Sequence, residues 1–195
     1  IDHYIYHHSE GFNQFTPHIK FKKGKRSAYV VVSKGCVARC TFCHRFEKGY
    51  RVNPLESIIE HIKSLMSKYD VGYLEIADEN FGSYKDETVK LVKELGKLGL
   101  MWKARGVRAH TVDLEMLKLW KENGCTNVIY GIESGSPKML KVMEKKITLE
   151  QNIKALKETY EAELSTCVSL VLGMPGETDE TIDETIQFLL DIFPY

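Results

Sequence analysis

Short apolar runs alternate with amphipathic stretches along most of this sequence, and this alternation limits the possible fold more than any other feature. Each run is followed by apolar residues at helical spacing, as at Leu55, Ile58, Ile59 and Ile62. Strands separated by helices pair in parallel with right-handed crossovers. The sequence therefore predicts an α/β fold of five parallel β-α units, with strands at residues 28–33, 71–77, 101–107, 127–132 and 164–172.

Capping signals mark where several helices should begin. Asn53, Pro54 and Glu56 supply a cap, a first-turn proline and a capping-box acid, and Thr148 with Gln151 forms another capping box. The periodicity fits a partial barrel and an open doubly wound sheet equally well. In both folds ligands bind beyond the carboxyl ends of the strands. Further helices are expected at residues 86–98, 113–122 and 179–193, and from Pro137 onward.

The composition argues against partners that are recognised by bulk charge. The 195 residues carry 27 basic and 27 acidic side chains, so no overall field attracts nucleic acid or anionic membranes. No apolar run reaches the ~18 residues of a membrane span, and no leader pattern opens the chain. Cys125 and Cys167, far apart in apolar surroundings, are expected to be buried free thiols. We expect a cytoplasmic protein without a membrane span or a clear nucleic-acid site.

The first part of the chain differs from the rest. Residues 1–27 mix His, Tyr and Phe with a basic run and show no sustained period. We expect them to be a lead-in or linker, and residues 28–195 to be the core domain. The chain begins at Ile1 and ends at Tyr195, just after the fifth unit. We therefore expect a segment of a longer protein, with the core incomplete at its C-terminus.

Three cysteines lie directly behind the first predicted strand. Cys36, Cys40 and Cys43 follow Gly35 with the spacing Cys-x-x-x-Cys-x-x-Cys. Thiolates select zinc, copper(I) or iron-sulfur clusters. Three thiolates on a four-iron cluster leave one iron able to bind a small molecule, which indicates catalysis rather than storage.

Three other interpretations compete with a cluster at this motif. A structural zinc needs a fourth ligand, and His44 lies too close to Cys43 for the usual spacing. The run Cys-x-x-Cys-His also matches the attachment pattern of c-type haem, but that pattern does not need Cys36. Redox-active or merely buried thiols are the last alternative. The third cysteine and its spacing favour the cluster.

With Phe42 before its last cysteine, and a strand and a glycine before its first, the motif resembles the signature of the radical S-adenosylmethionine enzymes. The resemblance implies that Cys36, Cys40 and Cys43 hold a 4Fe-4S cluster, whose fourth iron binds the amino and carboxylate groups of S-adenosylmethionine. It implies that Phe42 lies near the adenine, and that one electron cleaves the sulfonium to a 5'-deoxyadenosyl radical. The implied fold is a partial (β/α)6-type barrel with about five units present here, and the implied reductant is a protein such as flavodoxin or ferredoxin.

The loop after the second predicted strand also resembles a family motif. Ala77-Asp78-Glu79-Asn80-Phe81 is similar to the motif of the cobalamin-associated branch, which implies that Asp78, Glu79 and Asn80 jointly bind the methionyl amine. The residue types alone allow this role, since carboxylate and amide oxygens accept hydrogen bonds from an ammonium.

Two later loops extend the resemblance. Residues 131–145 are similar to a motif in which Glu133 and Ser134 contact the nucleoside and Lys145 pairs with the methionine carboxylate. Residues 171–178 resemble the fifth-strand motif, which implies that Leu172 and Gly173 receive the adenine.

Basic residues after the third predicted strand leave two roles open. Arg105, Arg108 and His110 could bind a carboxylate or phosphate of a substrate, or could pair with Glu75 and Asp78 within the fold.

These features predict an enzyme that cleaves S-adenosylmethionine within a larger protein, which performs cobalamin-assisted methylation, cyclisation or rearrangement on a small-molecule or lipid substrate. The segment lacks an Asp-x-His-x-x-Gly pattern, so a cobalamin domain is expected elsewhere in the parent protein. Two alternatives stay open. A methylthiotransferase needs three more cysteines for a second cluster, and a zinc- or cluster-stabilised scaffold would not be an enzyme.

Overall fold

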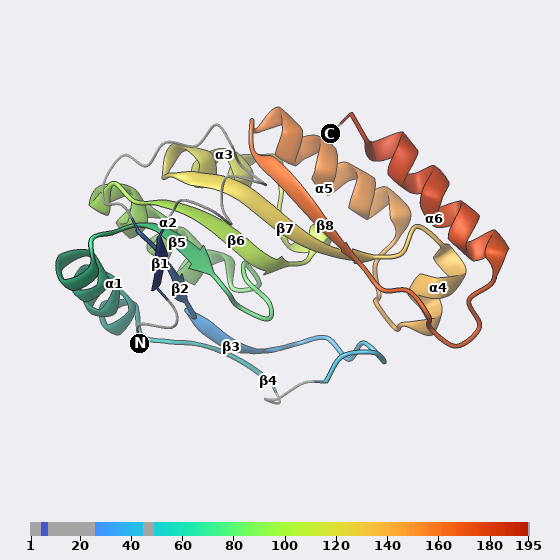
Figure 1. Cartoon of the computed structure of the whole chain (residues 1–195), viewed down its shortest axis with the longest axis horizontal. Coiled ribbons are helices and arrows are strands. Elements are labelled where there is room, and N and C mark those ends of the chain that lie inside the picture. The colour runs from blue at the N-terminus through green and yellow to red at the C-terminus, as the bar shows by residue number, and fades with distance from the viewer. Residues whose placement is uncertain (1–4, 8–25, 45–48, 195) are drawn as a thin grey trace.

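The computed structural model describes residues 5–7, 26–44 and 49–194. Its main sheet has the strand order β1-β2-β5-β6-β7-β8, in which β1 is antiparallel to β2 and all later neighbours are parallel (Figure 1). The five expected parallel strands are therefore confirmed. The strands of this sheet are β1 (Ile5–His7), β2 (Arg26–Val30), β5 (Val71–Ile76), β6 (Met101–Val107), β7 (Cys125–Glu133) and β8 (Ser165–Leu170).

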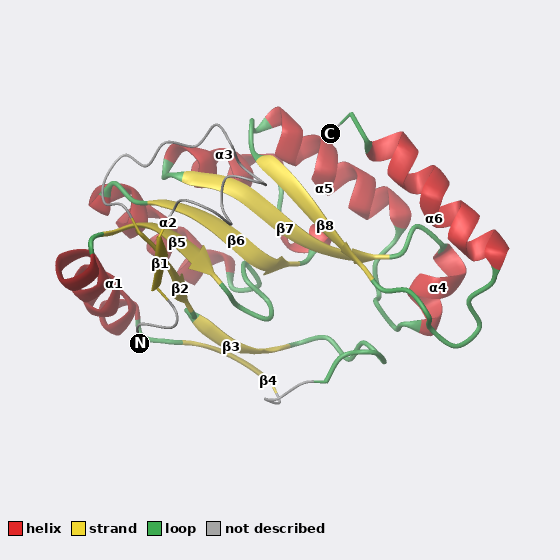
Figure 2. Ribbon diagram, viewed as in Figure 1, coloured by secondary structure: helices red, strands yellow, loops and turns green. Residues whose placement is uncertain are grey.

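Helices follow the parallel strands, as expected for β-α units, so the sheet and its helices form a partial barrel of five units (Figure 2). Of these helices, α3 and α5 lie along one face of the sheet, while α4 and α6 lie beyond the ends of β7 and β8 (Figure 1). The helical elements are α1 (Leu55–Tyr69), α2 (Lys85–Leu98), the 3-10 turn η2 (Ala109–Thr111), α3 (Leu114–Glu122), α4 (Pro137–Val142), α5 (Leu149–Glu161) and α6 (Asp179–Ile192).

The core lies between the sheet and the helices that cover it. Phe81, Trp102 and Trp120 form its aromatic centre, with ring centroids 5.2 to 6.0 Å apart. Alternate strand residues such as Leu74 and Val128 are fully buried on the same face. Burying each such side chain contributes ~1.5–3 kcal/mol, so this one face of the sheet supplies most of the apolar stabilisation.

The capping signals were right at α5 and wrong at α1. Thr148 and Gln151 make the reciprocal capping box, and Ser136 accepts a hydrogen bond from the Met139 backbone N–H at the start of α4. At α1 no side chain caps the first turn. The Asn53 amide donates instead to the Val31 carbonyl, at 3.2 Å, because the chain arrives at α1 from a strand that runs beside that residue.

A second sheet of two antiparallel strands, β3 (Ser33–Cys36) and β4 (Gly49–Val52), was not anticipated. The strand predicted at residues 28–33 is split, since β2 ends at Val30 and β3 begins at Ser33. Residues 1–27, expected to be a lead-in, contain β1 and the first two residues of β2. The rest of that segment, including its basic run, lies outside the described residues. No described helix is long and apolar enough to cross a bilayer.

Candidate active site

One cavity collects residues from the cysteine loop and from the carboxyl ends of β5, β6 and β7. Its volume is about 120 Å³, below the ~300–1,000 Å³ of typical small-molecule sites. The lining residues are Cys36, Ala38, Cys40, Phe42, Cys43, Glu79, Gly106, Val107, Arg108, Gly131, Glu133 and Lys145.

The cysteine loop begins inside a strand and then bridges to α4. Cys36 is the last residue of β3, Cys40 is buried and Cys43 is exposed. The loop is tied to the other side of the cavity at Thr41, whose backbone N–H donates to the Met143 carbonyl at 3.0 Å and whose hydroxyl donates to the Val142 carbonyl at 3.1 Å. All three cysteines therefore face the same space although they lie on different local structures.

Asp78 and Glu79 form one side of the site, which we call the clamp wall because it holds the strand that leads to Cys36. Asp78 is 5% exposed and accepts hydrogen bonds from the Val32 backbone N–H, at 2.8 Å, and from the Ser33 hydroxyl. Burial raises the pKa of the Asp78 carboxyl, while those hydrogen bonds act in the opposite direction. Its carboxylate is thus committed to β3.

Glu79 is held more loosely than its neighbour. Its Oε2 accepts a hydrogen bond from the Gly35 backbone N–H at 2.8 Å, and the side chain lines the cavity. The close fit of this wall against β6 depends on Gly106, which has a φ of +68° and no room for a side chain, since a Cβ there would lie 2.2 Å from the Asp78 carbonyl oxygen. Of the two acids in this wall, Glu79 is the one that lines the cavity.

The opposite side, which we call the ion-pair wall, consists of Arg108, Glu133 and Lys145. Lys145 Nζ lies 2.7 Å from Glu133 Oε1, and both side chains are at most 10% exposed. The same Nζ lies 6.0 Å from the centroid of the Phe42 ring, so the ammonium faces the cysteine loop. A cation and a carboxylate predicted to contact different parts of one ligand are therefore paired with each other.

Backbone geometry makes room for this ion pair. Glu133 has a φ of +68°, at a point where the register between β7 and β8 shifts. A non-glycine residue in this region is strained by about 1–3 kcal/mol, and such strain persists where the surrounding structure fixes it. A Cβ on Gly131 would lie 2.4 Å from Glu133 Oε1 and 3.0 Å from Lys145 Nζ, so a side chain there would displace the ends of both ion-pair partners.

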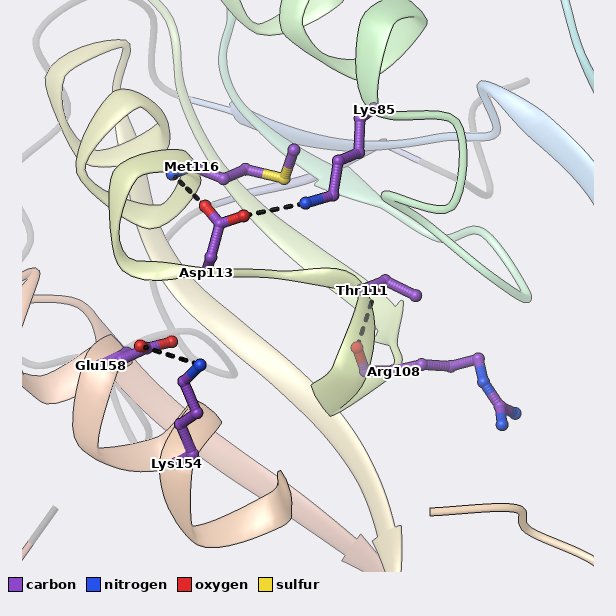
Figure 3. A network of polar contacts seen from close by, with 7 residues as sticks. All are labelled: Lys85, Arg108, Thr111, Asp113, Met116, Lys154 and Glu158. Atoms are coloured by element: carbon purple, nitrogen blue, oxygen red, sulfur yellow. Dashed lines mark hydrogen bonds and ion pairs between the residues drawn. The ribbon is translucent and has the colours of Figure 1, made fainter. Parts of the chain in front are cut away.

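Arg108 completes the ion-pair wall from the end of β6. Its backbone carbonyl accepts a hydrogen bond from the Thr111 hydroxyl at 2.8 Å, while its side chain extends away from the contacts that Asp113 makes with Lys85 and Met116 (Figure 3). The guanidinium donates to the Lys145 carbonyl at 2.8 Å, and Nε is buried without a hydrogen-bond partner among the described residues. Arg108 therefore lines the cavity with an Nε–H donor that has no partner among the described residues.

The charges of the ion-pair wall affect the pKa of His110. Burial lowers the pKa of its imidazole, and the nearby charges of Arg108 and Lys145 lower it further. The described surroundings of His110 are thus net positive.

Several residues predicted for the site lie outside the cavity. Asn80 is fully buried, and its amide has no hydrogen-bond partner among the described residues. Ser134 shares a hydrogen bond of 3.1 Å with Thr185 and so packs against α6. Leu172 is 68% exposed, and Gly173 donates its backbone N–H to Glu177 in the loop after β8.

The sequence also missed several lining residues. Ala38, Gly106, Val107 and Gly131 received no role, and Arg108 was left with two. A glycine between Arg105 and Val107 in a predicted strand is a signal of a bulge or a close backbone approach, and it could have indicated Gly106.

The donor set suits a cluster better than a single ion. In the described part of the chain, no three His, Cys, Asp or Glu side chains are close enough to share one metal ion. A four-iron cluster takes one thiolate on each iron, so its cysteines stand farther apart than the ligands of one ion. Three cysteines around one cavity fit that arrangement.

Several known proteins are similar in sequence to this chain. An uncharacterized methyltransferase, PH0819, from Pyrococcus horikoshii is 34% identical over 165 residues, covering 82% of this chain and 36% of the relative. The anaerobic magnesium-protoporphyrin IX monomethyl ester cyclase of Rubrivivax gelatinosus is 27% identical and covers 94% of this chain and 34% of its own length. A tRNA-2-methylthio-N(6)-dimethylallyladenosine synthase from Endomicrobium trichonymphae is 26% identical over 85% of this chain and 42% of that protein. The chain thus spans about a third of the length of the first two relatives.

A solved structure shows the fold, and a family profile shows the family. The radical S-adenosylmethionine methyltransferase TsrM from Kitasatospora setae, solved with cobalamin and a [4Fe-4S] cluster, superposes with a TM-score of 0.75 at 22% identity, over 87% of this chain and 33% of TsrM. This likeness shows the fold. The profile of the Radical SAM superfamily matches residues 30–189, and the chain therefore belongs to that superfamily of enzymes.

Proposed function

We propose that this chain is the S-adenosylmethionine-cleaving core of a larger enzyme, with a 4Fe-4S cluster held by Cys36, Cys40 and Cys43. The observation that supports it most directly is the cavity itself, where three cysteines, two carboxylates and two basic side chains meet. The cluster, when bound, supplies the electron that cleaves the sulfonium. The side chains of this protein bind and orient S-adenosylmethionine.

The two walls match the two charged groups of the methionine moiety. Glu79 uses one oxygen for the Gly35 N–H and can accept a hydrogen bond from the amino group with the other. Arg108 brings a buried Nε without a described partner, and Lys145 brings an ammonium shared with Glu133, so both suit the carboxylate. Asp78, whose two oxygens accept from Val32 and Ser33, supports Cys36 instead of binding the ligand.

In this proposal the nucleoside lies on the loop side of the cavity. Phe42 lines the cavity on the loop and offers an aromatic face to the adenine. Glu133 could accept hydrogen bonds from the ribose hydroxyls once Lys145 turns to the carboxylate.

For the whole enzyme we propose cobalamin-assisted methylation, cyclisation or rearrangement, with electrons from a flavodoxin or ferredoxin. This rests on relatives named as a methyltransferase and a cyclase, and on the likeness to a methyltransferase solved with cobalamin. Cobalamin would bind in a part of the protein other than these 195 residues.

A methylthiotransferase is the second candidate, because one relative carries that name. It would need a second cluster and three further cysteines. Iron and sulfide analysis of the full-length protein separates the two, since about four irons support one cluster and about eight support two.

Anaerobic reconstitution with iron and sulfide, followed by S-adenosylmethionine and dithionite, tests the proposed function. We expect cluster absorbance and formation of 5'-deoxyadenosine, both absent in Cys40→Ala and both retained in Cys125→Ala. A protein that takes up zinc in place of iron, or a reduced cluster that leaves S-adenosylmethionine intact, would refute it.

A further inference from the structure

The face of the sheet away from the helices carries a row of polar residues. Tyr29, Glu75, Lys103 and Asn127 are register partners across β2, β5, β6 and β7. Side chains alternate between the faces of a strand, and the neighbours Leu74, Trp102 and Val128 lie in the core under the helices. The row therefore lies on the inner face of the partial barrel, the face away from the helices.

Glu75 and Lys103 form the centre of this row. The Glu75 side chain is 3% exposed, and its Oε2 lies 2.8 Å from Lys103 Nζ. A carboxylate this deeply buried is stable only when a cation and hydrogen bonds accompany it. Lys103 is thus committed to Glu75.

Arg105 is a second cation beside the same carboxylate. Its Nη1 atom lies 3.7 Å from Glu75 Oε2, a distance too long for a hydrogen bond. Its guanidinium carbon lies 6.0 Å from the centroid of the Tyr29 ring. The Arg105 side chain is 44% exposed. Contact with an aromatic ring orients a guanidinium without using its N–H groups. Arg105 is thus held beside Glu75 and Tyr29 with a partly exposed side chain, and its N–H groups make no hydrogen bond within the described residues.

The position of Arg105 relates it to the proposed chemistry. The next residue, Gly106, lines the cavity that contains the three cysteines. A molecule held by Arg105 on the inner face would therefore lie next to that cavity. Lys103 and Arg105 together carry two positive charges against one negative charge on Glu75, so the described part of this site has a surplus of one positive charge.

We propose that Arg105 binds an anionic group of the substrate, a carboxylate or a phosphate, on the inner face of the barrel. The planar guanidinium pairs with either group through two parallel hydrogen bonds, a geometry that a lysine cannot supply. Glu75 fixes where the anion can lie, because it repels an anion that approaches Lys103. This inference rests on the proposed function, since it names the class of substrate that the same site would take.

The test uses the protein without cluster or S-adenosylmethionine, so its outcome is separate from that of the cleavage assay. The Arg105 side-chain N–H resonance is followed by NMR while inorganic phosphate or acetate is added at constant ionic strength. We expect a saturable shift with at least one of the anions. Phosphate alone indicates a phosphorylated substrate, acetate alone a carboxylate substrate, and a response to both supports the anion site without separating them.

Variants show whether the response belongs to Arg105. Affinity, followed through neighbouring backbone resonances, should fall about ten- to a hundredfold in Arg105→Gln and should fall in Arg105→Lys as well. It should not change in Lys97→Gln, a control on the exposed face of α2, where Lys97 pairs with Glu94. Thermal unfolding of each variant confirms that it is folded. No saturable shift with either anion, or unchanged affinity in a folded Arg105→Gln, would overturn the proposal.

Discussion

The two walls of the cavity hold their charges in different ways. On the clamp wall, the Asp78 carboxylate accepts hydrogen bonds from the Val32 backbone N–H and the Ser33 hydroxyl, so both of its oxygens hold the chain at the start of β3. On the ion-pair wall, Glu133 and Lys145 satisfy each other, and Arg108 keeps an unused donor. An ion pair between two side chains can be redirected to a ligand, whereas a carboxylate whose two oxygens both hold the chain, as at Asp78, cannot. Changes on the clamp wall should therefore affect the cysteine loop first, and changes on the ion-pair wall should affect ligand binding first.

The largest expected effect lies between the walls, at the cysteines. Replacing Cys36, Cys40 or Cys43 singly with Ala should abolish cluster binding and cleavage of S-adenosylmethionine, because each thiolate is expected to hold one iron. Cys125 is 2% exposed, and its replacement by Ala should only lower the free energy of unfolding, on the order of 1 kcal/mol. Iron content and absorbance of reconstituted protein check this, and full cluster occupancy in any of the first three variants would contradict it.

Breaking the ion-pair wall should come next in size. Lys145→Met leaves the Glu133 carboxylate buried without its cation, which should lower the free energy of unfolding by about 3–5 kcal/mol. Affinity for S-adenosylmethionine should fall about ten- to a hundredfold.

A double variant separates these two effects. Glu133→Gln combined with Lys145→Met removes both charges, so stability in urea unfolding should largely recover while affinity by calorimetry does not. Full recovery of affinity would show that the ion-pair wall has no part in binding.

On the clamp wall, Asp78→Ala should lower the free energy of unfolding by about 2–3 kcal/mol, because the buried Val32 N–H loses its acceptor. The cluster should be lost faster on exposure to a chelator, since β3 is no longer fixed. Asp78→Asn, which retains one acceptor oxygen, should show about half of each effect. Asp86→Asn, an exposed change in the first turn of α2, serves as the control. A normal rate of cluster loss in Asp78→Ala would refute the distinction between the walls.

The smallest effect concerns the protonation of His110. Its pKa is lowered in the folded protein, so the unfolded chain binds more protons just below the ordinary value of about 6.5, and stability should fall as pH falls through that window. His110→Gln should remove this dependence. A ligand carboxylate near Arg108 and Lys145 should raise the pKa of His110 again, which NMR titration of its imidazole can follow. An unchanged pKa with saturating S-adenosylmethionine would place the carboxylate elsewhere.

The sequence by itself determined the β-α order and the cysteine loop. Runs such as residues 71–76 and 101–107 place apolar residues at alternate positions and have helical patterns behind them, and this local periodicity survives in the fold because one face of each strand must be buried. The cysteine spacing is equally local. It brings three thiolates into one loop whatever the rest of the chain does, so both features could be predicted without a structure.

Only the tertiary structure decided which polar residues share the site. Asp78 and Glu79 are neighbours in sequence and both carboxylates accept hydrogen bonds from residues 32–35, yet of the two only Glu79 lines the cavity. The pairing of Glu133 with Lys145 requires a left-handed backbone at Glu133 and the absence of a side chain at Gly131. Arg105 and Arg108 lie three residues apart and reach different places, one the inner face of the barrel and one the cavity, since Gly106 bends the strand between them. These partners are decided by contacts between distant strands, and such contacts leave no period in the sequence.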